Sequence, residues 1–380
     1  MSLVSRFFIT AILRWLQLLA GLWTVSGALS SLLLGADESS ARPPVYLYCS
    51  VADARLIQVL SFDSQTGKVA KSSSLGTPGE PAALTSSADG RYLFASMRDT
   101  GRLCSFRIDS TTGALTLLSD VVAGADPAQI TLDRSGQYLF AAYYEAAKIS
   151  VHRVGADGRL SDAAVQEIAT AEKAHAIVPD PTNRLVFVPH TGPNRIYQFR
   201  FEEFVGRLLP GIPPYLQCPE QTGPRHLAWH PSLPFAYVDN EQGNSVTVYA
   251  LRGSSLVPGQ TSSTLPDDFR GQNATAEVRV HPDGRHLIVS NRGANSLAIF
   301  QINAGGDQLS PKEIVPCEPV PRCFDLTSDG RYLLLAGEGS GNLQVFRIGD
   351  LRGYLTEVDK LQVGPRLWWV HAVQVPAANR

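Results

Sequence analysis

A short strand-like run recurs seven times in the sequence, and this repeat limits the possible folds more than any other feature. Successive runs begin 46, 46, 47, 50, 51 and 46 residues apart. They are apolar, rich in β-branched and aromatic residues and bounded by Gly, Pro or Asp, which is typical of short strands. The runs are VYLYCS (45–50), RYLFAS (91–96), QYLFAA (137–142), RLVFVP (184–189), PFAYVD (234–239), RHLIVS (285–290) and RYLLLA (331–336).

A second position repeats with the same period. Each unit reads as a strand, a turn such as Asp-Gly-Arg, a second strand, a polar loop and a third strand. A unit of 40–50 residues with four antiparallel strands is typical of a propeller blade. We therefore predict an all-β fold, a seven-bladed β-propeller of four-stranded antiparallel blades. The residue twelve positions after the start of each run is aliphatic in all seven repeats: Ile57, Leu103, Ile149, Ile196, Val246, Leu297 and Leu343.

The two ends of the propeller are expected to share one blade, because a closed ring needs strands from both. The run at 45–50 lies close to the start of the predicted domain, and the apolar tail LQVGPRLWWVHAVQV occupies 361–375. We predict a propeller domain over 41–380 that is closed by its N- and C-terminal strands.

Residues 1–40 resemble a leader. Arg6 and Arg14 precede the apolar stretch 15–25, and the small-x-small sequence Ser-Gly-Ala follows at 26–28, as in a signal peptide. Arg14 interrupts the apolar run, so a membrane anchor is the weaker interpretation. We expect export to the periplasm or the exterior, with membrane contact only through an uncleaved leader. A misassigned start codon would instead leave the protein in the cytoplasm.

Composition excludes several classes of partner. The net charge is −2, and the six lysines and 27 arginines form no long basic tract, so no nucleic-acid partner is expected. The five cysteines include no Cys-x-x-Cys, which argues against a zinc site. Cys317 and Cys323 could pair after export or could be small buried residues. No cofactor or metal is predicted.

Comparison of equivalent positions across the repeats separates scaffold from candidate site. The first strand begins about nine residues before each run, and the second ends about seven residues after its start, so antiparallel pairing places both positions at one end of the blade. Glu241 and Arg292 occupy the later position in neighbouring repeats. The earlier position is alanine in three repeats, and in the other three that we compared it is His175, Arg225 and Arg322.

These side chains are expected to converge on one mouth of the channel. Several arginines around a carboxylate and an imidazole suit an anionic ligand and contain a candidate acid or base. The alternative is scaffolding, in which Arg225 and Glu241 form an ion pair and the histidine stabilises a turn. The candidate catalytic residues are His175, Arg225, Glu241 and Arg292, and the candidate substrate-binding residues are Arg322, Asn240 and Asn291.

The same segments resemble a known family. GPRHLAWHP, AYVDNEQGNSVTVY and AEVRVHPDGRHLIVSNRGANSLAIF are similar to seven-bladed lactonases, which include propeller-type 6-phosphogluconolactonases and fungal carboxymuconate lactonising enzymes. The resemblance covers about residues 43–375. It implies active-site roles for His175 in AHAIVPDPTNR, Arg225 in GPRH, Glu241 in VDNE and Arg292 in SNRG.

The chain departs from the family pattern close to the predicted cleft. Lys-Ala-His at 173–175 stands where family members often have His-x-His, and His-Thr-Gly at 190–192 stands where Asp-Leu-Gly is usual. Both changes lie beside the candidate histidine. We expect them to affect the choice of substrate.

The resemblance implies a lactone hydrolase with a small anionic lactone or sugar acid as its ligand, 6-phosphogluconolactone first. Glu241 would act as general base or hold His175 in the required tautomer, and the arginines would stabilise the oxyanion or bind the phosphate. Two alternatives keep the same fold. One is a muconate-type lactonising reaction, and the other is an exported propeller that binds a ligand or protein without turnover.

Overall fold

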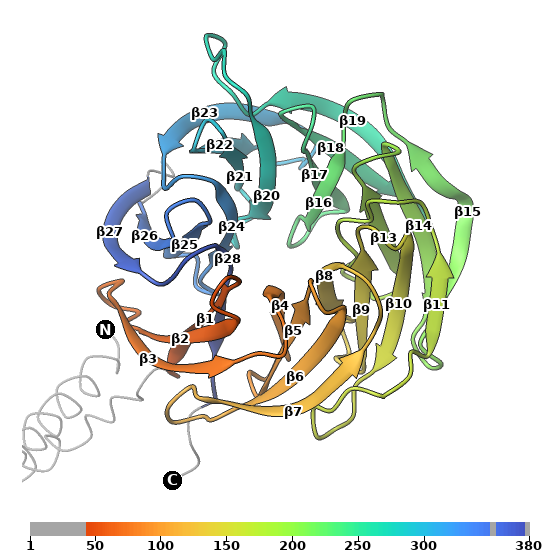
Figure 1. Cartoon of the computed structure of the whole chain (residues 1–380). Coiled ribbons are helices and arrows are strands. Elements are labelled where there is room, and N and C mark those ends of the chain that lie inside the picture. The colour runs from red at the N-terminus through yellow and green to blue at the C-terminus, as the bar shows by residue number, and fades with distance from the viewer. Residues whose placement is uncertain (1–42, 350–354, 377–380) are drawn as a thin grey trace, which may run out of the picture. The chain divides into compact units, whose positions relative to one another are not determined.

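The computed structural model describes residues 43–349 and 355–376, so the predicted leader lies outside the described residues. In these ranges every regular secondary-structure element is a β-strand, and the strands form seven sheets of four. The sheets are arranged as a ring (Figure 1), which confirms the predicted seven-bladed propeller. Within the same ranges no helix is long and apolar enough to cross a membrane.

The strands follow the repeat closely. Blades one to three consist of β28 (Leu367–Gln374) with β1 (Val45–Val51), β2 (Leu56–Phe62) and β3 (Val69–Gly76); β4 (Pro81–Ser86), β5 (Tyr92–Met97), β6 (Arg102–Ile108) and β7 (Leu115–Val122); and β8 (Pro127–Leu132), β9 (Tyr138–Tyr143), β10 (Lys148–Arg153) and β11 (Gln166–Ala169).

The remaining four blades have the same order. They consist of β12 (Val178–Pro179), β13 (Leu185–His190), β14 (Arg195–Glu202) and β15 (Arg207–Gln217); β16 (Pro224–Trp229), β17 (Phe235–Asn240), β18 (Ser245–Arg252) and β19 (Ser255–Ser263); β20 (Ala274–Val280), β21 (His286–Arg292), β22 (Ser296–Ile302) and β23 (Leu309–Pro316); and β24 (Pro321–Leu326), β25 (Tyr332–Gly337), β26 (Asn342–Ile348) and β27 (Leu355–Gln362).

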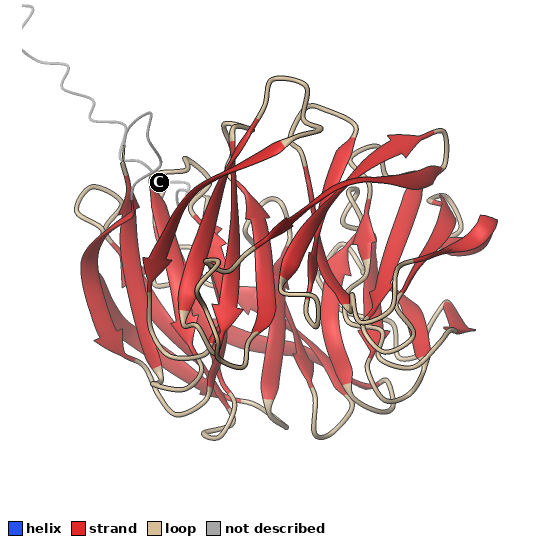
Figure 2. Ribbon diagram, turned by 90° about the horizontal axis from the view of Figure 1, so that it is seen from above, coloured by secondary structure: helices blue, strands red, loops and turns tan. Residues whose placement is uncertain are grey.

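The first strand of each blade lies at the centre of the ring and the fourth lies at its rim (Figure 1). Seen from the side, the strands run between two faces on which the connecting loops lie (Figure 2). Each inner strand therefore begins at one face, and the next strand returns to it. This geometry brings the start of β16 and the end of β17 to the same face of the ring.

The chain ends close the ring. β28 pairs antiparallel with β1, from Val45 opposite Gln374 to Val51 opposite Leu367. The last strand thus supplies the inner strand of the first blade, as the sequence predicted. β28 also packs against β24 and β4, the inner strands of the two neighbouring blades.

The aliphatic residue that marks each repeat is a core residue. All seven of these side chains have 0% of their surface exposed, and they lie in the apolar layers that join the blades. Burial of one such side chain stabilises the fold by roughly 1.5–3 kcal/mol. The repeat is visible in the sequence because every blade buries an aliphatic side chain at the equivalent position.

A left-handed residue ends the turn between the second and third strands of each blade, directly before the third strand. This backbone conformation disfavours side chains with a Cβ atom, and Gly and Asn tolerate it best. Five of the seven positions carry one of these two residues. The positions, with φ between 47° and 74°, are Arg55, Gly101, Ala147, Asn194, Asn244, Asn295 and Gly341.

The five cysteines are free thiols. Cys317 and Cys323, the pair that spacing alone left open, do not form a disulfide. Burial raises the pKa of the Cys317 thiol to about 12, and burial also raises the pKa of Cys323. Both residues act as small packing groups.

Two glycines at one repeat position offer a test of ring closure. Gly90 and Gly136 have φ of 68° and 72°. A Cβ atom on Gly90 would lie 2.3 Å from the carbonyl oxygen of Gln374 in β28, whereas a Cβ atom on Gly136 would meet nothing within 4 Å. We expect Gly136→Ala to lower the free energy of unfolding by about 1–2 kcal/mol, the cost of the left-handed backbone, and Gly90→Ala to lower it clearly more.

Denaturant midpoints of the two variants measure this difference. Equal losses in Gly90→Ala and Gly136→Ala would contradict the close packing of β28 against the turn of blade two.

Candidate active site

A β-bulge in the inner strands creates the site. In blade five Pro224 pairs with Asn240 and Leu227 pairs with Val238, so Arg225 and His226 together face one residue. A bulge of this kind re-aims the side chain of the extra residue. The position nine residues before each run is this extra residue, since β4, β8, β20 and β24 shift register at the same place.

The first and fourth blades reach the same arrangement differently. The register between β1 and β28 shifts between Ser50 and Val51, which makes Trp368 the extra residue of the first blade. In blade four the inner strand is reduced to Val178–Pro179, and the backbone N–H of His175 donates to the carbonyl oxygen of Pro189 at 2.9 Å. Trp368 and His175 therefore belong to the same ring of positions as Arg225.

The bulge residues and the ends of the second strands enclose a cavity of about 500 Å³, which we call the mouth cavity. It brings together four of the residues predicted from sequence: His175, Glu241, Arg292 and Arg322. Its other lining residues are Glu80, Arg98, Asp99, Asp126, Tyr144 and Trp368.

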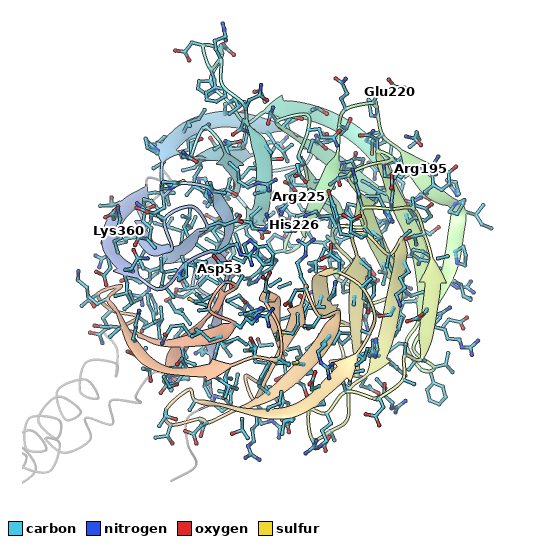
Figure 3. All side chains as sticks on the ribbon, in the orientation of Figure 1. Asp53, Arg195, Glu220, Arg225, His226 and Lys360 are labelled. Carbon is cyan, nitrogen blue, oxygen red and sulfur yellow. The ribbon has the colours of Figure 1, made fainter. Side chains whose placement is uncertain are left out.

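Arg225 lies beneath this cavity and is not one of its lining residues. Only 1% of its surface is exposed, and it sits near the centre of the ring beside His226 (Figure 3). Its Nε lies 3.4 Å from Oε2 of Glu241. Burial and the charge of Arg292 lower the pKa of Arg225, while Glu241 and Asp239 oppose the change.

Glu241 lies between two arginines. Arg292 donates from Nη2 to its Oε1 at 2.8 Å, and Arg225 contacts the other carboxylate oxygen. Burial alone would raise the pKa of Glu241, but Arg225 and Arg292 outweigh it and hold the pKa below the ordinary glutamate value. The carboxylate is therefore ionised at neutral pH and is a weak base.

His175 has the opposite charge state. Burial, together with Arg225 and His226, lowers its pKa well below 6.5, so the imidazole is neutral at neutral pH. Its Nδ1 is buried and has no hydrogen-bond partner among the described residues. Nε2 is therefore the ring nitrogen that can meet a ligand. No hydrogen bond within the described chain joins His175 to Glu241, so the predicted role of Glu241 in fixing the tautomer has no contact to support it.

Trp368 organises the arginines on another side of the cavity. The guanidinium carbons of Arg98, Arg322 and Arg366 lie 5.4, 5.2 and 4.6 Å from its ring centroids, within the range of cation–π attraction. Its Nε1 donates to Glu338 at 2.7 Å. Burial and Arg225 lower the pKa of Arg322 to about 9.

The remaining wall is acidic but balanced in charge. Arg98 Nη2 donates to Asp126 at 2.6 Å. The other two carboxylates of this wall pair with arginines that do not line the cavity. Asp99 pairs with Arg55 at 2.7 Å, and Glu80 pairs with Arg366 at 2.5 Å. Paired carboxylates of this kind can accept hydrogen bonds from hydroxyl groups without repelling a neutral sugar.

Two predicted substrate-binding residues lie elsewhere. Asn240 and Asn291 have no exposed surface. Asn240 donates to Ser245 and Thr247, both at 2.9 Å, and Asn291 donates to the carbonyl oxygen of Thr264 at 2.9 Å. Both amides stabilise loops inside their blades, and neither lines the mouth cavity.

One group in the described part of the chain has the ligand types and spacing of a metal site: His281, Asp283 and His286. It lies in the turn between β20 and β21, at the other end of the blade from the mouth cavity. His281 pairs through Nε2 with the carbonyl oxygen of Gly330 at 2.8 Å, just as His230 of the preceding blade pairs with Gly284 at 2.9 Å. His281 thus repeats a structural role of the turn.

The sequence analysis missed six residues that line the mouth cavity, and the repeat could have identified three of them. Arg98 and Tyr144 occupy the same repeat position as Glu241, so that comparison held the signal. Trp368 would have emerged by extending the 46-residue period beyond the seventh run, which places it nine residues before position 377. Asp239 is buried beneath the site, and burial raises its pKa to about 7.

Comparison with known proteins identifies the family. The model of the family described as lactonase, 7-bladed beta-propeller, matches residues 46–372. A 6-phosphogluconolactonase of Erwinia tasmaniensis is 30% identical over 59% of this chain and 67% of the relative, and one of Serratia proteamaculans is 31% identical over 58% and 67%. The structure of a periplasmic gluconolactonase of Pseudomonas aeruginosa superposes with a TM-score of 0.80 at 28% identity, over 87% of this chain and all of that one. The chain therefore belongs to the seven-bladed β-propeller lactonase family.

Proposed function

We propose that this lactonase hydrolyses a six-membered sugar lactone in the mouth cavity, with 6-phosphogluconolactone as the leading substrate. The observation that carries the proposal is a neutral His175 in one cavity with the cationic Arg292 and Arg322. Relatives named 6-phosphogluconolactonase support the choice of substrate.

His175 is the better candidate for the general base. Its Nε2 lone pair takes a proton from water as the water oxygen attacks the lactone carbonyl carbon. Arg292 and Arg322 stabilise the oxyanion that forms. When the oxyanion collapses, the bond between the carbonyl carbon and the ring oxygen breaks, and His175 returns its proton to the leaving oxygen. The product is a hydroxy acid, and Glu241 keeps Arg225 and Arg292 in place.

A second candidate substrate is the same lactone without a phosphate. The acidic wall and its arginines are paired, so the mouth cavity has little excess positive charge for a dianion. The Pseudomonas relative is named a gluconolactonase. We propose that residues 1–40 direct export of the protein. Export would favour the lactone without a phosphate, because phosphorylated lactones are scarce outside the cytoplasm.

Purified protein with each lactone in a pH-stat tests the proposal. We expect a rate well above spontaneous hydrolysis for at least one of the two lactones. Arg322→Met should lower kcat/KM more for 6-phosphogluconolactone than for gluconolactone if the arginine binds the phosphate. Rates equal to the spontaneous reaction with both lactones would refute hydrolysis.

Substitution of the two titratable residues distinguishes their roles. His175→Gln should lower kcat by roughly 10²-fold or more, the usual contribution of a general base. Glu241→Gln should lower kcat/KM but preserve the acid limb of the pH profile, because it leaves the base intact. A profile that loses its acid limb in Glu241→Gln and keeps it in His175→Gln would reverse the assignment.

The pH dependence has a defined sign. A base works only when unprotonated, and the pKa of His175 is lowered well below 6.5. The profile of kcat/KM should therefore stay flat from about pH 8 down to 6.5 and fall only in more acidic solution. Initial rates corrected for spontaneous hydrolysis measure it, and an acid limb centred at or above pH 6.5 would exclude the neutral buried histidine as the base.

A further inference from the structure

A second cavity, of about 320 Å³, lies in the other half of the channel. Its walls come from β8, β12, β16, β20 and β28, and they start just past the bulge and continue toward the turns. None of its lining residues lines the mouth cavity. Its volume lies within the range of small-molecule pockets, roughly 300–1,000 Å³. We call it the inner cavity.

A thin layer of side chains separates the two cavities. His175 lines the mouth cavity and His226 lines the inner cavity, with ring centroids 5.1 Å apart. Arg225, which is buried, contacts Glu241 on one side and the His226 ring on the other. The inner cavity is therefore a distinct space and not an extension of the candidate active site.

The inner cavity has buried polar atoms that the described residues leave unpaired. Glu277 is only 3% exposed. Its Oε1 lies 3.2 Å from Nδ1 of His226 and 3.5 Å from Nε of Arg279, but its Oε2 has no hydrogen-bond partner. The same holds for three N–H groups of the wall, those of Arg279 Nε, Trp229 Nε1 and Trp369 Nε1. One acceptor and three donors of the lining residues are thus buried in the wall of the cavity without a partner among the described residues.

The fold does not require these charges. At the two positions held by Glu277 and Arg279, blade two has Ala83 and Thr85, and blade four has Ala176 and Val178. Burying a carboxylate without full pairing costs free energy. A bound ligand that pairs with these groups would offset this cost.

Solvent and small molecules can reach the inner cavity. The side chain of Arg279 is 36% exposed, and Arg134 at the rim is also exposed. The lining thus carries two guanidinium groups, those of Arg134 and Arg279, and one carboxylate, that of Glu277. Outside the lining, Asp180 acts on Arg134 and Asp325 acts on Arg279. The wall favours a ligand with one negative charge that also carries hydroxyl donors.

We propose that the inner cavity is a second binding site, for a small polyhydroxy carboxylate. The ligand carboxylate would accept hydrogen bonds from the guanidinium groups of Arg279 and Arg134. Small rotations of the wall side chains would bring the tryptophan N–H groups and Oε2 of Glu277 to the ligand's hydroxyl groups. Opening of a sugar lactone releases this class of molecule, so the choice of ligand rests on the proposed function. The site is then a product site on the far side of the channel.

Calorimetric titration of the full chain with D-gluconate tests the inner cavity. Arg279→Gln and Trp229→Phe should each weaken binding, by about tenfold or more for the arginine. Arg292→Ala, which disables the mouth cavity, should leave this binding intact. Initial rates of lactone hydrolysis should remain within about twofold of wild type in Trp229→Phe. This variant retains every charge, so it tests the inner cavity even if Arg279→Gln fails to fold.

The possible outcomes are distinct. Binding lost in Arg292→Ala and retained in Arg279→Gln and Trp229→Phe would place gluconate at the mouth cavity alone and overturn the proposal. Normal hydrolysis without any gluconate binding at millimolar concentration would mean that the inner cavity holds solvent only. Binding that depends on Arg279, in a protein that opens neither lactone, would support the inner site while refuting the proposed function.

Discussion

Pairing of β28 with β1 is the contact on which the rest of the propeller depends. Without it β1 would present an unpaired edge, and the first blade would have no strand at the channel. The pairing joins residues more than 300 positions apart, from Val45 opposite Gln374 to Val51 opposite Leu367. It also packs β28 between the inner strands of blades two and seven. Because the ring is closed, residues on seven separate blades keep fixed positions around one channel.

The bulge at the start of each inner strand supplies the side chains of the candidate site. One extra residue breaks the alternation of the strand and points a side chain toward the mouth. Three blades place alanine there, which leaves room for the cavity. The others place His175, Arg225, Arg322 and Trp368, and the neighbouring strand ends add Glu241 and Arg292. The residues of the candidate site are thus concentrated at positions that differ between blades without changing the fold.

Much of this could be predicted because the informative patterns are local. The buried aliphatic position and the turn residues recur in each blade for the same packing reason, so the period indicated the fold. The antiparallel return of each second strand indicated which residues share a mouth. Asn240 and Asn291 were misplaced because side chains alternate along a strand: each directly precedes a residue that faces the cavity and therefore points the other way.

Other features depend on contacts that no local pattern records. Trp368 lies in a tail that looks like an incomplete repeat until β28 joins the first blade. The burial of Arg225 could not be predicted either. The repeat spacing places it at one end of the inner strand but does not show that only 1% of its surface is exposed. Asp239 occupies the position held by serine in blades one, two and six. It accepts the backbone N–H of His226 at 2.7 Å, as Ser290 accepts that of Glu277 at 3.0 Å. The substitution adds a buried carboxyl group under the site without changing the hydrogen bond.

Burial and the arginines together determine the charge states of both titratable groups at the mouth. Positive charge nearby stabilises an ionised carboxylate and destabilises a protonated imidazole. Burial is the largest cause of the lowered pKa of His175 and the arginines add to it, whereas at Glu241 the arginines outweigh burial and lower the pKa. One residue is thereby kept charged and the other neutral over the same pH range. An anion bound among the arginines would offset their charge and raise the affinity of His175 for a proton. In the proposed mechanism the oxyanion of lactone hydrolysis is such an anion, and it forms as His175 accepts the proton from water.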